Sequence, residues 1–203
     1  DRIAPTNKID PFKWTSESEN SLYGNSRDNG HIEIGTDLPS AFTDGGTGVM
    51  DRDDKVSGKI SITGTANDDQ VITEILAKIK DFKFDGITGA AEGAETKLTE
   101  YNPTTGKFKD VGTGTHIYNP NYVPKPLSGA SSSEQDAYNA YITKRDTFFA
   151  AKGWLLTIVH SEFSVEKGHT VKWRLDWDSS KINGGVGTNK TITITVKDTA
   201  QTN

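Results

Sequence analysis

Two segments near the end of the chain alternate between apolar and polar side chains, and no other feature constrains the fold as strongly. In residues 170–177 every second side chain is apolar, namely Val171, Trp173, Leu175 and Trp177. In residues 191–196, isoleucine or valine alternates with threonine, whose branched Cβ favours an extended backbone. Because successive side chains of a strand point to opposite faces, both segments are predicted as half-buried strands of an antiparallel sheet.

Shorter stretches of the same alternation occur along the rest of the chain. They predict further strands at residues 30–34, 59–66, 74–80, 107–111 and 154–160. The chain also contains 20 glycines and seven prolines, which suits short strands joined by polar loops. We therefore expect an all-β fold.

One stretch has helical periodicity instead. Between residues 133 and 152, aromatic and aliphatic residues recur three or four positions apart. Ser133 is predicted to cap the first turn, and Gly153 follows the last turn, where a left-handed residue is needed. We expect one inserted amphipathic helix whose aromatic stripe packs on the sheets; a ligand-binding stripe is the alternative.

Composition excludes several classes of function. The chain has no cysteine, so it has no disulfide, thiol nucleophile or thiolate metal site. Its formal charge is −5, and its basic residues are interspersed with acids, so we do not expect nucleic acid as a partner. No apolar run approaches the roughly 20 residues of a spanning helix, so we expect no membrane insertion.

Four motifs, in this order along the chain, resemble parts of bacterial immunoglobulin-like repeats. They are the opening Asp1-Arg2-Ile3-Ala4-Pro5-Thr6, the stretch from Val56 to Asp69 (VSGKISITGTANDD), Gly168-His169-Thr170-Val171 with the Trp173 strand, and Ile192 to Val196 followed by Lys197-Asp198-Thr199-Ala200. Such repeats are strung along adhesins and other surface proteins. The chain departs from the pattern at Gln201-Thr202-Asn203, which does not lead into another Ala-Pro junction.

The resemblance implies one immunoglobulin-like β-sandwich over residues 1–203, with insertions at about 10–50 and 82–153. It implies a non-catalytic structural or adhesive module of a larger bacterial surface or secreted protein, located extracellularly or at the cell surface. Neighbouring repeats of the same chain are the expected partners. A glycan or a host or cell-surface protein is a further candidate partner.

Acidic residues gather at three places in the sequence. They are Asp51, Asp53 and Asp54, then Asp68 and Asp69, and finally Asp176 and Asp178. Carboxylate-rich loops can hold calcium, and Asp1 and Asp198 near the chain ends would add oxygen ligands, although the spacing differs from an EF-hand loop. The alternative is that these residues only form solvated turns.

Aromatic residues in the polar loops point to a second class of function. Four rings, Trp14, Tyr101, Tyr118 and Tyr122, are candidates for stacking on sugars. They would make the chain a carbohydrate-binding module of a secreted enzyme. The alternative is that they anchor the loops to the sandwich.

Catalytic motifs are not evident. The sequence has no Gly-x-Ser-x-Gly elbow, and Gly45-Gly46-Thr47-Gly48 lacks the lysine of a phosphate-binding loop, so we do not expect an enzyme. His31 with Glu33 and His160 with Glu162 each share one face of a strand. Each pair offers two ligands to a transition metal, but ordinary surface pairs are the alternative.

Overall fold

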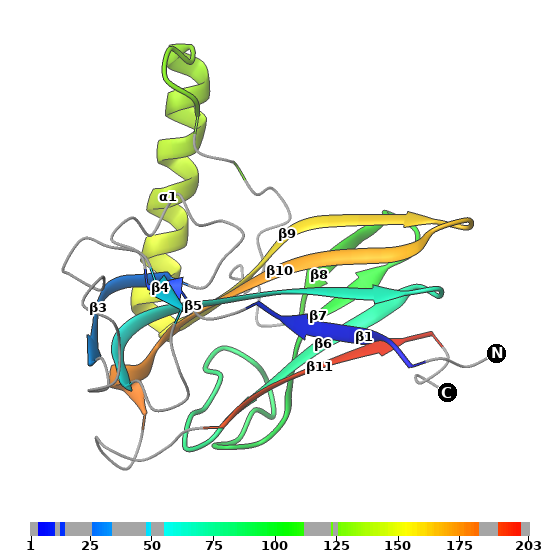
Figure 1. The fold of residues 1–203 in the computed structure, drawn as a ribbon, viewed down its shortest axis with the longest axis horizontal. Coiled ribbons are helices and arrows are strands. Elements are labelled where there is room, and N and C mark those ends of the chain that lie inside the picture. The colour runs from blue at the N-terminus through cyan, green and yellow to red at the C-terminus, as the bar shows by residue number, and fades with distance from the viewer. Residues whose placement is uncertain are drawn as a thin grey trace.

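The protein is mostly β, with two antiparallel sheets that face each other and one long helix (Figure 1). This arrangement confirms the expectation of a sandwich-like β fold with a single helix in the part of the chain that is described. The computed structural model describes residues 4–10, 13–14, 26–33, 48–49, 55–111, 123, 126–182 and 191–199.

The first sheet has the strand order β1-β5-β10-β9, and β3 also pairs with β5. Its strands are β1 (Thr6–Ile9), β3 (Ser26–Glu33), β5 (Lys55–Asp68), β9 (Trp154–Ser164) and β10 (Gly168–Asp178). Strand β5 is the longest, and its length lets it pair with β10 on one side and with β1 and β3 on the other.

The second sheet has the order β11-β6-β7-β8. Its strands are β6 (Ile72–Ile79), β7 (Thr96–Asn102), β8 (Lys107–Asp110) and β11 (Ile192–Asp198). Both β7 and β8 come from the interval 82–153 that was predicted as an insertion. The remaining elements are the short pair β2 (Lys13–Trp14) and β4 (Gly48–Val49) and the 3₁₀ turn η1 (Ser179–Lys181).

The core lies between the two sheets and is built from the alternate residues that the sequence pattern predicted. Trp173, Leu175 and Trp177 of β10 are almost completely buried there. The ring of Phe84 meets those of Phe82 and Trp154 edge-on, with centroids 5.2 and 5.0 Å apart, an arrangement that adds to the gain from burying the rings.

Helix α1 spans Ser132–Lys152, and both of its ends have side-chain or backbone caps. Its N-cap is Ser131, not Ser133 as predicted, because Ser131 forms a reciprocal capping box with Glu134. Gly153 ends the helix with a left-handed φ of 76°, as predicted, and its amide donates to the carbonyl of Phe149.

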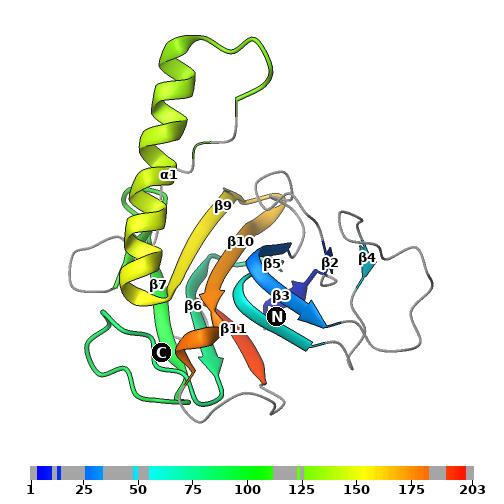
Figure 2. The same ribbon diagram turned by 90° about the vertical axis from the view of Figure 1, so that its left-hand side faces the viewer.

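The C-terminal part of α1 covers the outer face of the first sheet near β9. Tyr138, Tyr141 and Phe149 of the predicted stripe are buried, which confirms that these rings pack on the protein. This cover explains why Leu155 and Thr157, which alternate with the core residues of β9, are also buried. The first turns of α1 are exposed and project beyond the sheet (Figure 2). Within the described ranges, no helix is both long and apolar enough to cross a membrane.

The start of β1 and the end of β11 lie at the same end of the sandwich. Thr6 of β1 pairs with Asn67 at the end of β5, and the amide of Thr199 donates to the carbonyl of Val71 at the start of β6. Both contacts flank the turn between β5 and β6, and Figure 1 shows the start of β1 and the end of β11 close together there. We call this end the terminal pole; it also carries the hairpin between β9 and β10, because His169 pairs with Asp68.

Candidate functional site

The terminal pole holds the buried carboxyl group of Asp68, of which one oxygen accepts a hydrogen bond and the other accepts none from the described residues. Asp68 Oδ1 accepts a hydrogen bond from the amide of Gln70 at 2.7 Å, whereas Oδ2 is buried and has no hydrogen-bond partner among the described residues. Burial raises the pKa of Asp68, and the nearby charges of Asp198 and Asp69 raise it further. Asp198 is itself buried.

A carboxylate in this position needs a compensating positive charge or a proton. Oxygen ligands of this kind suit a hard cation such as calcium. The described part of the chain, however, brings together no group of three or more metal-ligating side chains. Asp68 is therefore at most part of a cation site, and a bound proton is the other way to offset its charge.

Asp176 lies in a different environment, because an arginine already neutralises it. Arg174 Nε donates to Asp176 Oδ1 at 2.8 Å, Arg174 Nη2 donates to Ser61 Oγ at 2.8 Å, and all three residues are buried. They lie on the outer face of the first sheet close to Tyr141 of α1, where burial raises the pKa of Tyr141 to about 12. Asp178 is also engaged, since it caps η1 through the amide of Ser180.

The predicted calcium ligands are therefore not assembled into one site. Asp68 and Asp69 lie at the terminal pole, whereas Asp176 and Asp178 lie at the other end of the β5–β10 ladder, which runs from the His169–Asp68 pair to the Asp178–Lys59 pair. The remaining predicted ligands, Asp51, Asp53 and Asp54, lie outside the described residues.

A buried histidine, which the sequence pattern did not single out, lies beside Asp68. His169 Nδ1 accepts a hydrogen bond from the amide of Ile72 at 3.0 Å, so the ring proton must be on Nε2, which faces Ser161 Oγ at 2.9 Å. Burial lowers the pKa of His169 to about 4. Because Nε2 already carries a proton, the neutral ring cannot act as a general base toward Ser161.

Only one of the four predicted sugar-binding rings can be placed. Tyr101 is half-buried, with its ring edge-on to Phe108 at 5.2 Å and to His169 at 5.0 Å between centroids. This packing matches the alternative in which the ring anchors its strand. Trp14 belongs to β2 but its side chain is not described, and Tyr118 and Tyr122 lie outside the described residues.

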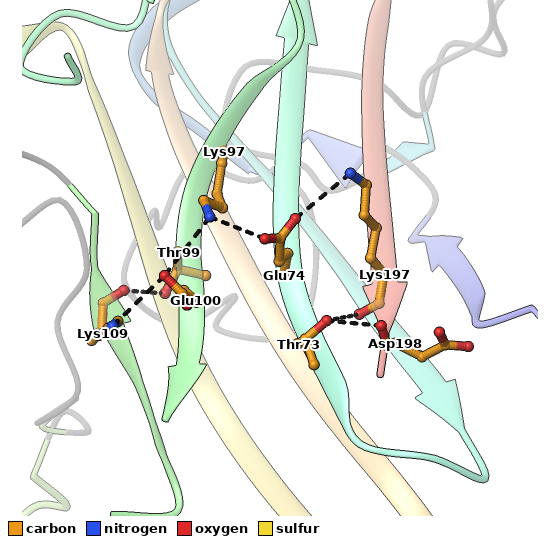
Figure 3. Close-up of polar contacts among 8 residues, drawn as sticks. All are labelled: Thr73, Glu74, Lys97, Thr99, Glu100, Lys109, Lys197 and Asp198. Carbon is orange, nitrogen blue, oxygen red and sulfur yellow. Dashed lines mark hydrogen bonds and ion pairs between the residues drawn. The ribbon is translucent and has the colours of Figure 1, made fainter. Parts of the chain in front are cut away.

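The outer face of the second sheet carries a row of alternating charges across all four strands (Figure 3). Glu74 of β6 lies 3.0 Å from Lys97 Nζ on one side and 3.6 Å from Lys197 Nζ on the other. Glu100 Oε2 of β7 lies 3.7 Å from Lys109 Nζ of β8, which extends the row to the fourth strand. The hydrogen bond that Lys97 Nζ donates to Glu74 Oε1 raises the pKa of Lys97. Sequence reasoning missed this row because it depends on the strand register.

Two further surface features lie on β9 and the hairpin that follows it. The exposed His160 and Glu162 form a pair with 3.5 Å between Nε2 and Oε2, as expected for an ordinary surface pair. His31 and Glu33 belong to β3, but their side chains are not described. Val165 at the hairpin tip is 92% exposed.

Comparisons of the chain with protein-family models, curated proteins and solved structures gave no match.

Proposed function

We propose that this chain is a non-catalytic adhesive module with immunoglobulin-like topology that works at a cell surface. In this proposal β1, β5, β10 and β9 take the places of strands A, B, E and D of an immunoglobulin domain, and β6 and β11 take those of C and F. Strands β7 and β8 extend the second sheet as C′ and C″ do in variable-type domains. The fold alone does not imply the function.

The position of the chain ends carries the proposal. A module that acts as a spacer in series transmits the chain from one end of the sandwich to the other. Here Thr6 and Thr199 both bond to residues beside the β5–β6 turn, so the described backbone enters and leaves at the terminal pole. Attachment at the terminal pole would leave the opposite pole and the outer face of the second sheet available to a partner, which suits adhesion better than spacing.

A second observation supports a role without catalysis. Ser161 and His169 form a hydroxyl–imidazole contact of the kind used by nucleophilic enzymes. The direction of this hydrogen bond does not suit catalysis. His169 Nδ1, the only ring nitrogen that could accept a proton, already accepts the amide N–H of Ile72. Arg174, Asp176 and Ser61 are likewise bonded to one another under α1.

The test is an adhesion assay. Beads coated with the protein through a C-terminal tag, which anchors the terminal pole, are passed over glycan-coated, protein-coated and cell-covered surfaces. Beads coated with heat-unfolded protein are the control. Retention that requires the folded protein supports the proposal, whereas no retention on any surface, including one coated with the protein itself, contradicts it. Retention on glycan alone would favour the carbohydrate-binding alternative.

We also propose that calcium binds at the terminal pole. The proposal is supported by the buried Asp68 Oδ2 without a described partner and by the neighbouring carboxyl of Asp198. We expect millimolar calcium to raise the melting temperature after chelation, because a ligand that prefers the folded state stabilises it. Asp68→Asn should abolish the rise, and Asp178→Asn should keep it. No rise with the unmodified protein would leave a proton as the compensating charge.

A further inference from the structure

The outer face of the second sheet collects lysines from all four of its strands. Residues that pair across an antiparallel ladder share a face, and buried residues such as Ala77 and Phe108 mark the inner one. The strand register therefore places five lysines on the outer face, namely Lys78, Lys97, Lys107, Lys109 and Lys197. The exposed Lys80, whose amide bonds to Thr191 just before β11, continues the alternation of β6 and adds a sixth.

Glu74 is less exposed than the two lysines that flank it. Its side chain is 14% exposed, and its carboxylate oxygens lie 3.0 Å from Lys97 Nζ and 3.6 Å from Lys197 Nζ. The side chains of Lys97 and Lys197 are 39% and 33% exposed, so they reach further into solvent than the carboxylate between them (Figure 3). Because Glu74 already holds both ammonium groups in place, less side-chain freedom is lost when they bind an anion.

The other acids on this face are engaged as well. Glu100 lies 3.7 Å from both Lys97 and Lys109, and Glu95 accepts a hydrogen bond from Thr195. Among the described residues, the face thus carries six lysines against three glutamates, whereas the whole chain has a formal charge of −5. A positive face on an acidic protein attracts a polyanion to one side of the molecule, because the remaining surface repels it.

We propose that this face binds a linear glycan that carries sulfate or phosphate groups. All of the basic residues described on the face are lysines. Lysine binds such oxyanions as a point charge that tolerates many orientations, whereas recognition of carboxylates in a fixed geometry favours the bidentate fork of arginine. Neighbouring strands lie about 4.8 Å apart and alternate residues of a strand about 6.7 Å apart, so an extended chain with repeated charges can meet several lysines at once.

The uncharged residues of the face disfavour two other classes of ligand. Among the described residues of the four strands, the uncharged outward positions are Leu76, Asn102, Thr193 and Thr195, none of which is aromatic. The rings of Tyr101 and Phe108 lie on the inner side, against His169. Single-stranded nucleic acids and neutral sugars are usually held on exposed rings, on which bases or sugars stack. A glycan recognised through its charges needs no such ring.

Binding at this face does not require the proposed adhesive function, whereas the placement of the glycan on an opposing surface rests on it. Strand β6 begins and β11 ends at the terminal pole, so a module attached there presents the face along its side. Binding through exposed lysines weakens as salt screens the charges. Salt dependence therefore separates this site from sugar binding by stacked rings.

The first test compares two polymers with the same backbone, dextran sulfate and uncharged dextran. Each fluorescently labelled polymer is titrated with the full chain, and binding is read from fluorescence anisotropy. EDTA is present throughout, which excludes bridging by calcium. We expect the protein to bind dextran sulfate but not dextran, and the affinity to fall about tenfold or more between about 50 and 200 mM salt. A glycerol polymer linked by phosphodiesters, titrated in the same way, shows whether phosphate serves as well as sulfate.

Charge reversal then locates the site on the molecule. Lys107→Glu combined with Lys109→Glu should weaken the binding of dextran sulfate about tenfold or more, because it turns two attractive contacts into repulsive ones. Lys78→Glu combined with Lys80→Glu, on a different strand, should do the same. All four side chains are exposed, so the variants should remain folded, and a melting curve for each one checks this.

The matched control is Lys144→Glu combined with Lys167→Glu, at exposed positions of α1 and of the β9–β10 hairpin. It changes the net charge by the same amount and should weaken binding less than about threefold. An equal loss in the control, no binding of dextran sulfate, or equally tight binding of single-stranded DNA would overturn the proposal. Retention of the beads on protein-coated or cell-covered surfaces would then still support adhesion, so the two failures are distinguishable.

Discussion

At the scale of single residues, Asn7 joins the two sheets. Its Oδ1 accepts from the indole Nε1 of Trp173 at 3.1 Å, and its Nδ2 donates to the carbonyl of Ile194 at 3.1 Å. Trp173 belongs to β10 of the first sheet and Ile194 to β11 of the second. One amide therefore satisfies a buried donor in one sheet and an edge acceptor in the other.

Removing this amide should destabilise the fold. Asn7→Ala leaves the indole N–H of a nearly fully buried Trp173 without its acceptor, which costs about 1–3 kcal/mol. Urea unfolding followed by tryptophan fluorescence measures the loss. Lys8→Ala, at the exposed neighbouring position, is the control and should change stability by less than about 0.5 kcal/mol. Equal effects of the two changes would contradict the role of Asn7.

His169 should make stability depend on pH. Its pKa falls from 6.5 to about 4 on folding, so the unfolded chain binds the proton more readily between these values. The stabilisation is complete above pH 6.5 and is lost as the pH falls toward 4, by about 3 kcal/mol. Unfolding curves for the unmodified protein and for His169→Gln, measured from pH 7.5 to 4, isolate this contribution. If both proteins lose stability equally with pH, the histidine is not responsible.

At the scale of elements, the capping residues decide where α1 begins and ends. Seven consecutive residues from Ser131 are exposed, so packing contributes little to the first turns of the helix. The capping box between Ser131 and Glu134 is therefore the main local support for these turns.

Ser131→Ala should loosen the start of the helix without unfolding the protein. The lost cap costs about 1 kcal/mol locally. Hydrogen exchange should speed up in residues 132–137, whereas the global unfolding midpoint should hardly move, because those turns project beyond the sheet. Ser132→Ala, one residue further on, is the matched control. A large shift of the global midpoint would show that the first turns carry tertiary contacts.

At the scale of the whole molecule, the shared terminal pole determines how the fold resists force. Pulling on residues 4 and 199 loads β1 and β11 from their ends near the β5–β6 turn, so their hydrogen bonds break one after another. Pulling on residues 4 and 180 applies the load along the β5–β10 ladder, whose bonds must break together.

We therefore expect a lower peak force for the first attachment than for the second. Single-molecule force spectroscopy on Ala4→Cys/Thr199→Cys and Ala4→Cys/Ser180→Cys proteins measures it, since the natural chain offers no competing thiol. The second variant is the matched control for the first. An equal or higher force through residues 4 and 199 would favour a load-bearing spacer over a module attached at one pole.

Much of the β structure could be predicted from alternation, but β1, β7 and the two-residue strands β2 and β4 could not. The prediction for residues 170–177 corresponds to β10 and that for 191–196 to β11, each within two residues at either end. Strand β7 went unrecognised because its buried residues besides Leu98 are the polar Thr96 and Thr99, so its sequence shows no apolar alternation. Strand β1 was missed because its sequence, Thr-Asn-Lys-Ile, contains a single apolar residue and so shows no alternation.

The candidate site was less predictable than the fold. The sequence identified Asp68 and Asp176 as equivalent acids, but the tertiary structure gives them opposite environments. Asp176 is neutralised by Arg174, whereas the charges that act on Asp68 are those of two other carboxyl groups, Asp198 and Asp69. Which charges meet depends on strand register, and the register of β5 with β10 is a long-range property.

The sequence by itself determined the class of secondary structure, the core faces of the main strands and the C-terminal end of the helix. These follow from local rules, because side-chain period and backbone conformation depend on neighbouring residues. Only the tertiary structure decided that Thr6 and Thr199 lie at one pole, that Asn7 links the sheets and that β11 pairs with β6 among the described strands. Those features depend on which strands pair, and pairing joins residues far apart in the chain.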